Sequence, residues 1–249
     1  MTTALVRRPG PRLAEGLVSH IERQSVDVEL ALRQWHGYVS ALRATGWTIV
    51  EVEPADDCPD AVFVEDPVVV HRDVAVLARS GAPGRRAETA GVERAVRAAG
   101  YRVERITAPG TLDGGDVLKV GSTVYVGLSD RTNEAGAQQL AACLDATVVP
   151  VPVTKVLHLK SAVTALPDGT VIGHPPLVDD PAAFPDFLAV PEEAGAHVVV
   201  LGGRRVLLAA SAPATASLLA ERGLEPVVVD ISEFEKLEGC VTCLSVRLR

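Results

Sequence analysis

The apolar positions of this chain recur in one plan: an apolar run, a tight turn, a second apolar run, a helical stretch and a closing apolar run. Short runs of this kind, rich in Val and bounded by turn residues, are typical of buried strands. The plan starts anew along the chain, in segments that occupy residues 68–106, 116–153, 162–172 and 197–229. The third of these carries a β-hairpin signal at Asp168-Gly169. Two strands usually precede each helix, whereas a doubly wound sheet alternates single strands with helices.

The remaining residues complete a fifth copy that is split between the two ends of the chain. Cys240–Leu248 supplies one strand and Ala4–Arg7 the next, Gln24–Thr45 forms the long helix, and Trp47–Val52 is the closing strand. Units that recur about every 35–50 residues are typical of propellers and other repeat arrays. We therefore predict a single domain over residues 1–249, an α/β propeller of five ββαβ-like repeats around a pseudo-fivefold axis. The alternative is an ordinary doubly wound sheet.

Composition and charge narrow the range of functions. With 249 residues, 47% of them hydrophobic, the chain is long enough for one substantial core. A net charge of −8 and a pI near 5.3 argue against a nucleic-acid-binding protein. We find no apolar run of signal-peptide or bilayer-spanning length, and four cysteines are too few for a disulfide scaffold. We expect a cytoplasmic protein with no membrane or nucleic-acid partner, either a monomer or a homodimer.

Four short polar motifs lie at the edges of apolar, strand-like runs. A purely structural sequence would not need charged or titratable side chains at these positions. The motifs are Phe63–Pro67, Leu112–Asp116, Leu157–Ser161 and Thr242–Ser245. Between them they provide a thiol, an imidazole, a carboxylate to orient the imidazole, and a separate carboxylate pair for a cation. These are the groups of a cysteine-dependent enzyme that acts on a cationic substrate.

Cys243 is the thiol in the last motif, directly after a loop at Glu238-Gly239. An arbitrary cysteine in such a run is more often a small buried hydrophobe. The spacing Cys240-x-x-Cys243 raises two further interpretations, a redox pair and a zinc site. A thioredoxin-like motif opens a helix, whereas this one precedes a strand. A structural zinc site needs a second pair of ligands, which Cys58 and Cys143 do not form.

The imidazole and the carboxylates each have a plain structural alternative. His158 stands between two leucines, a setting more typical of a packed core histidine, yet an imidazole suits proton transfer to a leaving amine and from water. Asp113 and Asp116 flank two glycines, which fits either a turn or a carboxylate that holds an imidazole. Glu65 and Asp66 are either a solvated surface pair or a pair buried against a cation, for which a planar guanidinium is the natural partner.

Taken together and in order, these motifs resemble the dimethylarginine dimethylaminohydrolases, guanidino-group-modifying enzymes that share the pentein α/β-propeller fold. The resemblance covers essentially the whole chain. It includes Leu17, Asp60, Phe63–Asp66, Gly81–Arg86, Leu112–Asp116, Gly127–Asn133, His158–Ser161, Glu235-Lys236 and Cys243–Ser245. The departures remove no catalytic group: Glu238 stands where some relatives carry Asp, and Cys240 has no role in the family pattern.

The resemblance implies a role for each motif. Cys243 is the expected nucleophile, His158 the general acid and base, and Asp113 the carboxylate that orients His158. The substrate guanidinium is expected between carboxylates, the substrate's α-carboxylate on arginines, and its α-amine on backbone groups. The corresponding residues are Glu65, Asp66 and Asp60 for the guanidinium, Arg85 and Arg131 for the carboxylate, and Leu17 and Leu237 for the amine, with Phe63 also at the substrate site. A lid is expected around 15–19.

The implied reaction is hydrolysis of Nω-methylated arginine, either asymmetric dimethylarginine or monomethylarginine. The products are citrulline and dimethylamine or methylamine, and the intermediate is an S-alkylthiouronium on Cys243. The resemblance implies no metal and no organic cofactor. The alternatives are another guanidine-modifying enzyme of the arginine deiminase or amidinotransferase type, and a non-catalytic pentein-fold binding protein. Arginine deiminases usually carry an extra helical domain, for which this chain has no room.

Overall fold

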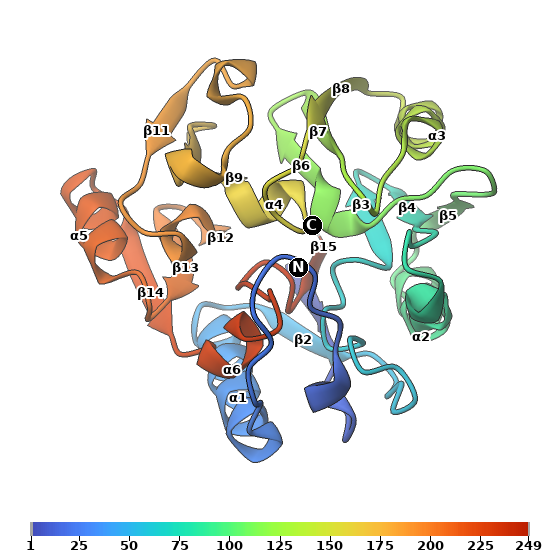
Figure 1. Cartoon of the computed structure of the whole chain (residues 1–249), viewed down its shortest axis with the longest axis horizontal. Coiled ribbons are helices and arrows are strands. Elements are labelled where there is room, and N and C mark those ends of the chain that lie inside the picture. The colour runs from blue at the N-terminus through green and yellow to red at the C-terminus, as the bar shows by residue number, and fades with distance from the viewer. Residues whose placement is uncertain (1, 249) are drawn as a thin grey trace.

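Five small sheets are arranged in a ring in the computed structural model, which describes residues 2–248 (Figure 1). Each sheet has three strands, and in each the middle strand is antiparallel to one neighbour and parallel to the other. The strand orders are β15-β1-β2, β3-β4-β5, β6-β7-β8, β9-β10-β11 and β12-β13-β14. The predicted five-unit arrangement is therefore confirmed.

The strand and helix bounds follow the predicted units closely. The strands are β1 Thr3–Val6, β2 Thr48–Glu51, β3 Val68–His71, β4 Val74–Leu77, β5 Arg102–Arg105, β6 Val117–Val120, β7 Thr123–Leu128, β8 Thr147–Pro152, β9 Val163–Ala165, β10 Val171–Gly173, β11 Phe187–Ala189, β12 Val199–Gly202, β13 Arg205–Ala209, β14 Glu225–Val229 and β15 Val246–Leu248. The helices are α1 Val28–Ala44, α2 Thr89–Ala98, α3 Glu134–Leu144, α4 Leu159–Ala162, α5 Pro213–Glu221 and α6 Ser232–Glu235.

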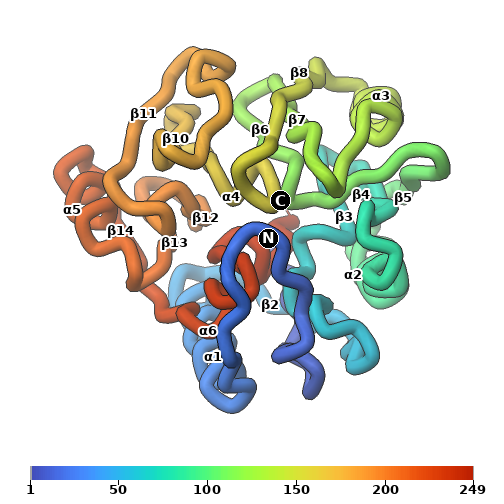
Figure 2. Tube along the Cα trace, in the orientation of Figure 1, coloured from blue at the N-terminus to red at the C-terminus, as the bar shows by residue number. Residues whose placement is uncertain are grey.

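The helices α1, α2, α3 and α5 lie on the outside of the ring, and the antiparallel strand of each sheet lies toward its axis (Figure 2). Two of these helices, α1 and α3, begin where a short polar side chain accepts a backbone N–H group. Asp27 caps α1 through the N–H of Leu30, and Asn133 caps α3 through the N–H of Gly136. One face of α1 is buried against its sheet, because its apolar residues recur at helical spacing.

The sheet β9-β10-β11 departs from the repeat plan, because it has no α-helix between its second and third strands. Two short 3₁₀ helices, Pro175–Leu177 and Pro181–Ala183, occupy that connection instead. The segment between β10 and β11 contains four prolines, at positions 175, 176, 181 and 185. Since proline lacks an N–H and clashes with the preceding helical turn, this segment cannot form the outer helix of the other units.

The first and last strands of the chain meet in one sheet, as predicted. β1 pairs in antiparallel register with β15, with Leu5 opposite Val246, and in parallel register with β2. The predicted strand over 240–248 was too long, because β15 begins only at Val246. Residues 240–243 form a turn instead, closed by a hydrogen bond of 3.1 Å from the N–H of Cys243 to the carbonyl oxygen of Cys240.

The strands β3, β6, β9, β12 and β15 line a cavity of about 320 Å³ at the ring axis, which we call the axial cavity. Charged side chains reach into it, and these are Glu65, Arg72, Lys119, Lys160 and Arg247. Within residues 2–248, no helix is both long enough and apolar enough to cross a bilayer.

Candidate active site

A second, narrower cavity adjoins the axial one and collects most of the predicted site residues; we call it the substrate cavity. Its free volume, on the measure that gives about 320 Å³ for the axial cavity, is only about 10 Å³. Its lining residues are Leu17, Asp60, Phe63, Asp66, Arg85, Arg131, Leu157, His158, Leu237, Glu238, Gly239 and Cys243. The ring explains this gathering: Asp66, Asp113, His158 and Cys243 each lie just before the inner strand of a different blade.

Cys243 reaches the substrate cavity from the turn that precedes β15. It is almost buried, with 6% of its surface exposed. Its carbonyl oxygen accepts the N–H of Glu65 at 3.2 Å, which ties the turn to the segment before β3. The next residues of the motif are buried as well, so the thiol is held by a fixed backbone.

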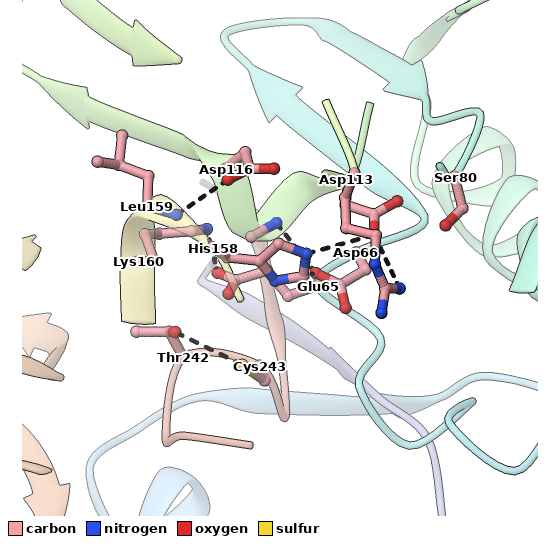
Figure 3. Close-up of polar contacts among 12 residues, drawn as sticks. Glu65, Asp66, Ser80, Asp113, Asp116, His158, Leu159, Lys160, Thr242 and Cys243 are labelled. Carbon is pink, nitrogen blue, oxygen red and sulfur yellow. Dashed lines mark hydrogen bonds and ion pairs between the residues drawn. The ribbon is translucent and has the colours of Figure 1, made fainter. Parts of the chain in front are cut away.

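His158 lies directly before α4 and is surrounded by carboxylates (Figure 3). Its Nε2 is 3.3 Å from Oδ2 of Asp113, and its Nδ1 is 3.7 Å from Oδ1 of Asp66. Burial alone lowers the pKa of the imidazole, but the charges of Asp66, Asp116 and Asp113 outweigh it and raise the pKa to about 9. The imidazole is therefore a cation at neutral pH.

Asp116, the second acid of its motif, fixes the backbone beside His158. Its Oδ1 accepts the N–H of Leu159 at 2.9 Å, and its Oδ2 accepts the hydroxyls of Ser129 and Thr132, both at 2.7 Å. Burial raises the pKa of Asp116, and the His158 charge opposes that shift. With these partners, Asp116 sets the position of the residue that follows the imidazole.

The two glycines between Asp113 and Asp116 let the chain segments approach closely. A Cβ on Gly115 would lie 2.4 Å from Nδ1 of His158 and 2.8 Å from Oδ1 of Asp66. A Cβ on Gly114 would lie 2.1 Å from the carbonyl oxygen of Glu65. The motif needs glycine at both positions because any side chain would displace the imidazole or the acidic segment.

Asp66 and Arg85 form a buried ion pair at the wall of the substrate cavity. Nη1 of Arg85 is 2.7 Å from Oδ2 of Asp66, and Glu88 accepts the guanidinium through both carboxylate oxygens at 3.0 and 2.9 Å. Burial opposes charge on all three groups. The pKa of Arg85 is nevertheless raised well above its usual value by Asp66 and Glu88, and that of Asp66 is lowered by His158 and Arg85.

The segment before α1 crosses the cavity and is tied down by two carboxylates. Oδ1 of Asp60 accepts the N–H of Leu17 at 2.9 Å. The carboxylate of Glu238 accepts the N–H groups of Ser19 and His20, both at 2.7 Å. The lid expected around 15–19 therefore lies closed over the site. Burial raises the pKa of Asp60, and Arg85 and the Leu17 hydrogen bond oppose the shift.

Arg131 lines the same cavity and has fewer protein partners than Arg85. Its Nη2 donates to the hydroxyl of Ser19 at 3.2 Å, and its Nη1 lies 3.9 Å from Asp113 Oδ2. Phe63 and Leu237 are buried in the apolar part of the wall.

Two predicted site residues do not line the substrate cavity: Asp113, which is fully buried against His158, and Glu65. Oε1 of Glu65 is 2.5 Å from Nζ of Lys160 and 3.5 Å from Arg247, and Glu65 lines the axial cavity. The expectation that Glu65 and Asp66 grip one cation together therefore does not match their side-chain directions. Both residues lie in the turn before β3, which directs Asp66 to the substrate cavity and Glu65 to the axial cavity.

Four residues of the site had no role in the expectations from the sequence. They are Glu88, Asp116, Lys160 and Glu238. Asp116 and Lys160 lie inside motifs that the sequence singles out, so their positions were visible although their partners were not. The pairing of Glu88 with Arg85 carries no comparable signal, and Glu238 stood out only as a departure from the family pattern. Among the described residues, no cluster of three or more His, Cys, Asp or Glu side chains is suited to a metal ion.

Comparison with known proteins places this site in a family. The profile described as N,N dimethylarginine dimethylhydrolase, eukaryotic, matches residues 19–165. The N(G),N(G)-dimethylarginine dimethylaminohydrolase of Streptomyces coelicolor is 70% identical over 249 residues, which cover 99% of this chain and 96% of that protein. The protein of the same name from Pseudomonas aeruginosa is 37% identical over 251 residues, covering 98% of each.

Solved structures agree with the sequence matches. A cysteine-to-serine mutant of the Pseudomonas aeruginosa enzyme complexed with citrulline superposes with a TM-score of 0.92 at 35% identity, covering 99% of this chain and 98% of that one. The N-terminal domain of ArgZ, a cyanobacterial arginine dihydrolase, has a TM-score of 0.86 at 20% identity over 99% and 98%, and so shares the fold. The chain therefore belongs to the dimethylarginine dimethylaminohydrolase family and has its pentein α/β-propeller fold.

Proposed function

We propose that this chain hydrolyses Nω-methylated arginine to citrulline and a methylated amine, with Cys243 as the nucleophile. The observation that carries the proposal is the meeting of a thiol, a cationic imidazole and carboxylates in one cavity. Cys243 and His158 line the substrate cavity together with Asp60 and Asp66, and Arg131 lines it too. The family membership supports the same reaction.

In the proposed mechanism, the thiolate of Cys243 attacks the guanidinium carbon, whose bond to the methylated nitrogen then breaks. The departing amine takes a proton from His158, and an S-alkylthiouronium remains on the sulfur. Neutral His158 next takes a proton from water, which attacks the same carbon and releases citrulline. Asp113 holds Nε2 of the imidazole, so Nδ1 is the nitrogen left to exchange the proton.

The guanidinium is held in this proposal by Asp66, with Asp60 nearby. Oδ2 of Asp66 is occupied by Arg85, while Oδ1 faces His158 and the N–H of Gly115. A guanidinium beside Oδ1 would lie next to the imidazole that must protonate its leaving nitrogen. Glu65 is not assigned to the guanidinium, because its carboxylate pairs with Lys160 and lines the axial cavity.

The other end of the substrate is assigned to Arg131 and the lid. Arg131 has the freer guanidinium, because Arg85 is already bound by Asp66 and by both oxygens of Glu88. We therefore assign the α-carboxylate mainly to Arg131, with Arg85 in support. The N–H of Leu17 is taken by Asp60, so its carbonyl and that of Leu237 are the groups left for the α-amine.

The test is citrulline release from asymmetric dimethylarginine, monomethylarginine and arginine. Agmatine turnover is measured separately, because the same chemistry converts agmatine to N-carbamoylputrescine and ammonia. Cys243→Ser should abolish turnover, because a hydroxyl is far less ionised than a thiol near neutral pH. Arg131→Ala should weaken turnover of dimethylarginine by roughly ten- to a hundredfold, since one charge-assisted contact is worth about 1.5–3 kcal/mol. The same variant should change agmatine turnover little, because agmatine has no α-carboxylate.

Two outcomes would contradict the proposal. Citrulline release by Cys243→Ser at the wild-type rate would remove Cys243 as the nucleophile. A wild-type preference for agmatine over methylated arginine would remove the carboxylate-binding role of Arg131. Mass spectrometry of rapidly quenched wild-type reactions should in addition detect the covalent adduct on the peptide that contains Cys243.

A further inference from the structure

Cys240 is a buried thiol that the proposed reaction does not use. It lies in the same turn as Cys243, and the two sulfur atoms are 3.2 Å apart. Both cysteines are free and nearly buried, with 4% and 6% of their surfaces exposed. Only Cys243 lines the substrate cavity. The chain thus places a second thiol directly behind its nucleophile.

The turn holds the two sulfurs close to bonding geometry. The hydrogen bond from the N–H of Cys243 to the carbonyl of Cys240 closes the turn and keeps both side chains on one side of it. A disulfide has an S–S length of about 2.05 Å, so the sulfurs need to approach by only about 1 Å. Thr242 Oγ1, 3.3 Å from the sulfur of Cys240, is the other close polar partner.

The ionisation of each thiol also depends on the other. Hydrogen bonding to Cys243 lowers the pKa of Cys240, and the same interaction together with burial raises the pKa of Cys243. Because the sulfurs titrate as a pair, the first proton leaves more easily than from an isolated thiol and the second leaves less easily. A singly ionised pair is the form that reacts with oxidants.

We propose that Cys240 is a resolving thiol, which converts an oxidised Cys243 into a reversible Cys240–Cys243 disulfide. The oxidant is a hydroperoxide, here hydrogen peroxide. In the singly ionised pair the remaining proton moves to Cys240, and Cys243, the sulfur that lines the substrate cavity, attacks one peroxide oxygen. The O–O bond breaks, hydroxide leaves, and Cys243 becomes a sulfenic acid. Cys240 then attacks that sulfur and the S–O bond breaks. In total, two thiols and one peroxide give one disulfide and two waters.

The disulfide stops catalysis but preserves the nucleophile. A sulfenic acid without a nearby thiol is exposed to further oxidation to a sulfinic acid, which thiols do not reverse. A disulfide is instead reduced by thiol–disulfide exchange. The loss of activity on oxidation rests on the proposed role of Cys243 as the nucleophile, whereas formation of the disulfide does not.

The test compares wild type with Cys240→Ser after treatment with hydrogen peroxide. Free thiols are then alkylated, peptides are mapped by mass spectrometry, and citrulline release is measured before and after dithiothreitol. Wild type should become two hydrogen atoms lighter through a 240–243 linkage, lose nearly all activity, and regain it with dithiothreitol. Cys240→Ser should start with most of its activity, take up oxygen at Cys243 and recover little.

A matched control removes the two remaining cysteines. Cys58 and Cys143 lie elsewhere in the fold, so the double variant Cys58→Ser with Cys143→Ser should respond to peroxide as wild type does. The proposal is overturned if wild type takes up oxygen at Cys243 without the linkage, or if Cys240→Ser recovers as completely as wild type. If the linkage forms but Cys243→Ser still releases citrulline, the resolving chemistry stands and the proposed nucleophile is wrong.

Discussion

His158 is the buried cation among the carboxylates of the site. Burial disfavours its charge, but the surrounding carboxylates favour it. Asp66, Asp113 and Asp116 each favour the protonated ring, and together they raise its pKa from 6.5 to about 9. A protonated imidazole already carries the proton that a leaving amine needs, which suits His158 to the proposed role of general acid.

The raised pKa makes a prediction about stability and pH. A group with a higher pKa in the folded state binds protons more tightly there, so its stabilisation is complete below pH 6.5 and is lost as pH rises through about 9. His158→Gln should therefore be less stable than wild type at pH 6. The gap in free energy of unfolding should shrink by on the order of 3 kcal/mol by pH 9.5. Urea unfolding of both proteins across this range measures the gap, and a constant gap would show that folding does not raise the pKa of His158.

Gly115 gives a second prediction at this scale. A methyl group at this position collides with the imidazole and with Asp66, so Gly115→Ala must displace His158. A displacement of about 1 Å in a catalytic group can cost about 10² in rate, which is the fall in kcat/KM we expect. Gly37→Ala is the matched control, because nothing lies within 4 Å of its added Cβ in helix α1. That control should keep full activity and gain up to about 1 kcal/mol of stability. Normal activity in Gly115→Ala would mean that the imidazole tolerates displacement.

The residue types of the site could be predicted from the sequence, but several of their partners could not. The motifs identified Cys243, His158 and Asp113, and the structure places them together. The motif did not predict the direction of the Glu65 side chain. Glu65 is adjacent to Asp66 in the sequence, but Glu65 pairs with Lys160 and Asp66 pairs with Arg85. The partners Glu88 and Lys160 depend on the approach of separate segments, which a single sequence does not encode locally.

Among the elements, the lid is the one whose position depends on few contacts. Residues 17–20 are largely exposed and are held at their backbone by Asp60 and Glu238. Glu238 itself has a positive φ of 59°, at the bend that leads into the Cys240–Cys243 turn. The carboxylate that holds the lid is thus attached to the bend that leads to Cys243, the proposed nucleophile.

Glu238→Gln should loosen the lid. An amide has one acceptor oxygen where the carboxylate has two, and its NH₂ faces a backbone N–H, so one of the two lid hydrogen bonds is lost. This loss should weaken the free energy that holds the lid closed by about 1–2 kcal/mol, which should raise KM roughly five- to thirtyfold. Hydrogen exchange at 17–23 should become faster. Glu22→Gln, an exposed carboxylate of the same segment, is the control and should change neither. If KM and exchange in Glu238→Gln stay at wild-type values, Asp60 alone holds the lid.

The repeat plan predicted the elements well, and its two errors have local causes. Prolines prevent a helix between β10 and β11, and the strand predicted from residue 240 begins six residues later because 240–243 form a turn. Hydrophobic patterning does not distinguish a buried turn from a buried strand when both are apolar. That turn carries Cys243, the proposed nucleophile.

At the scale of the whole molecule, the ring is closed by hydrogen bonds between the two ends of the chain. β15 contributes its apolar side chains to a core shared with the neighbouring blade, where Leu5 and Val246 pack with Val64 and Leu77. Each blade is too small to bury its apolar faces alone, as in other repeat proteins. That the 249 residues unfold as one domain stays a prediction, and the positions of the tryptophans make it testable.

Both tryptophans belong to the blade that joins the termini: Trp35 lies in α1 and Trp47 precedes β2. Fluorescence therefore reports that blade, while far-ultraviolet circular dichroism reports all five. In one cooperative domain the two signals should give the same midpoint in urea. Val246→Asp places an unpaired carboxylate in the shared core and should lower the free energy of unfolding by at least about 3 kcal/mol, with the two midpoints still coincident. Val228→Asp on the exposed face of β14 is the matched control and should stay within about 0.5 kcal/mol of wild type. A fluorescence midpoint well below that of circular dichroism, in either wild type or Val246→Asp, would mean that the terminal blade unfolds separately and that the ring is not one cooperative unit.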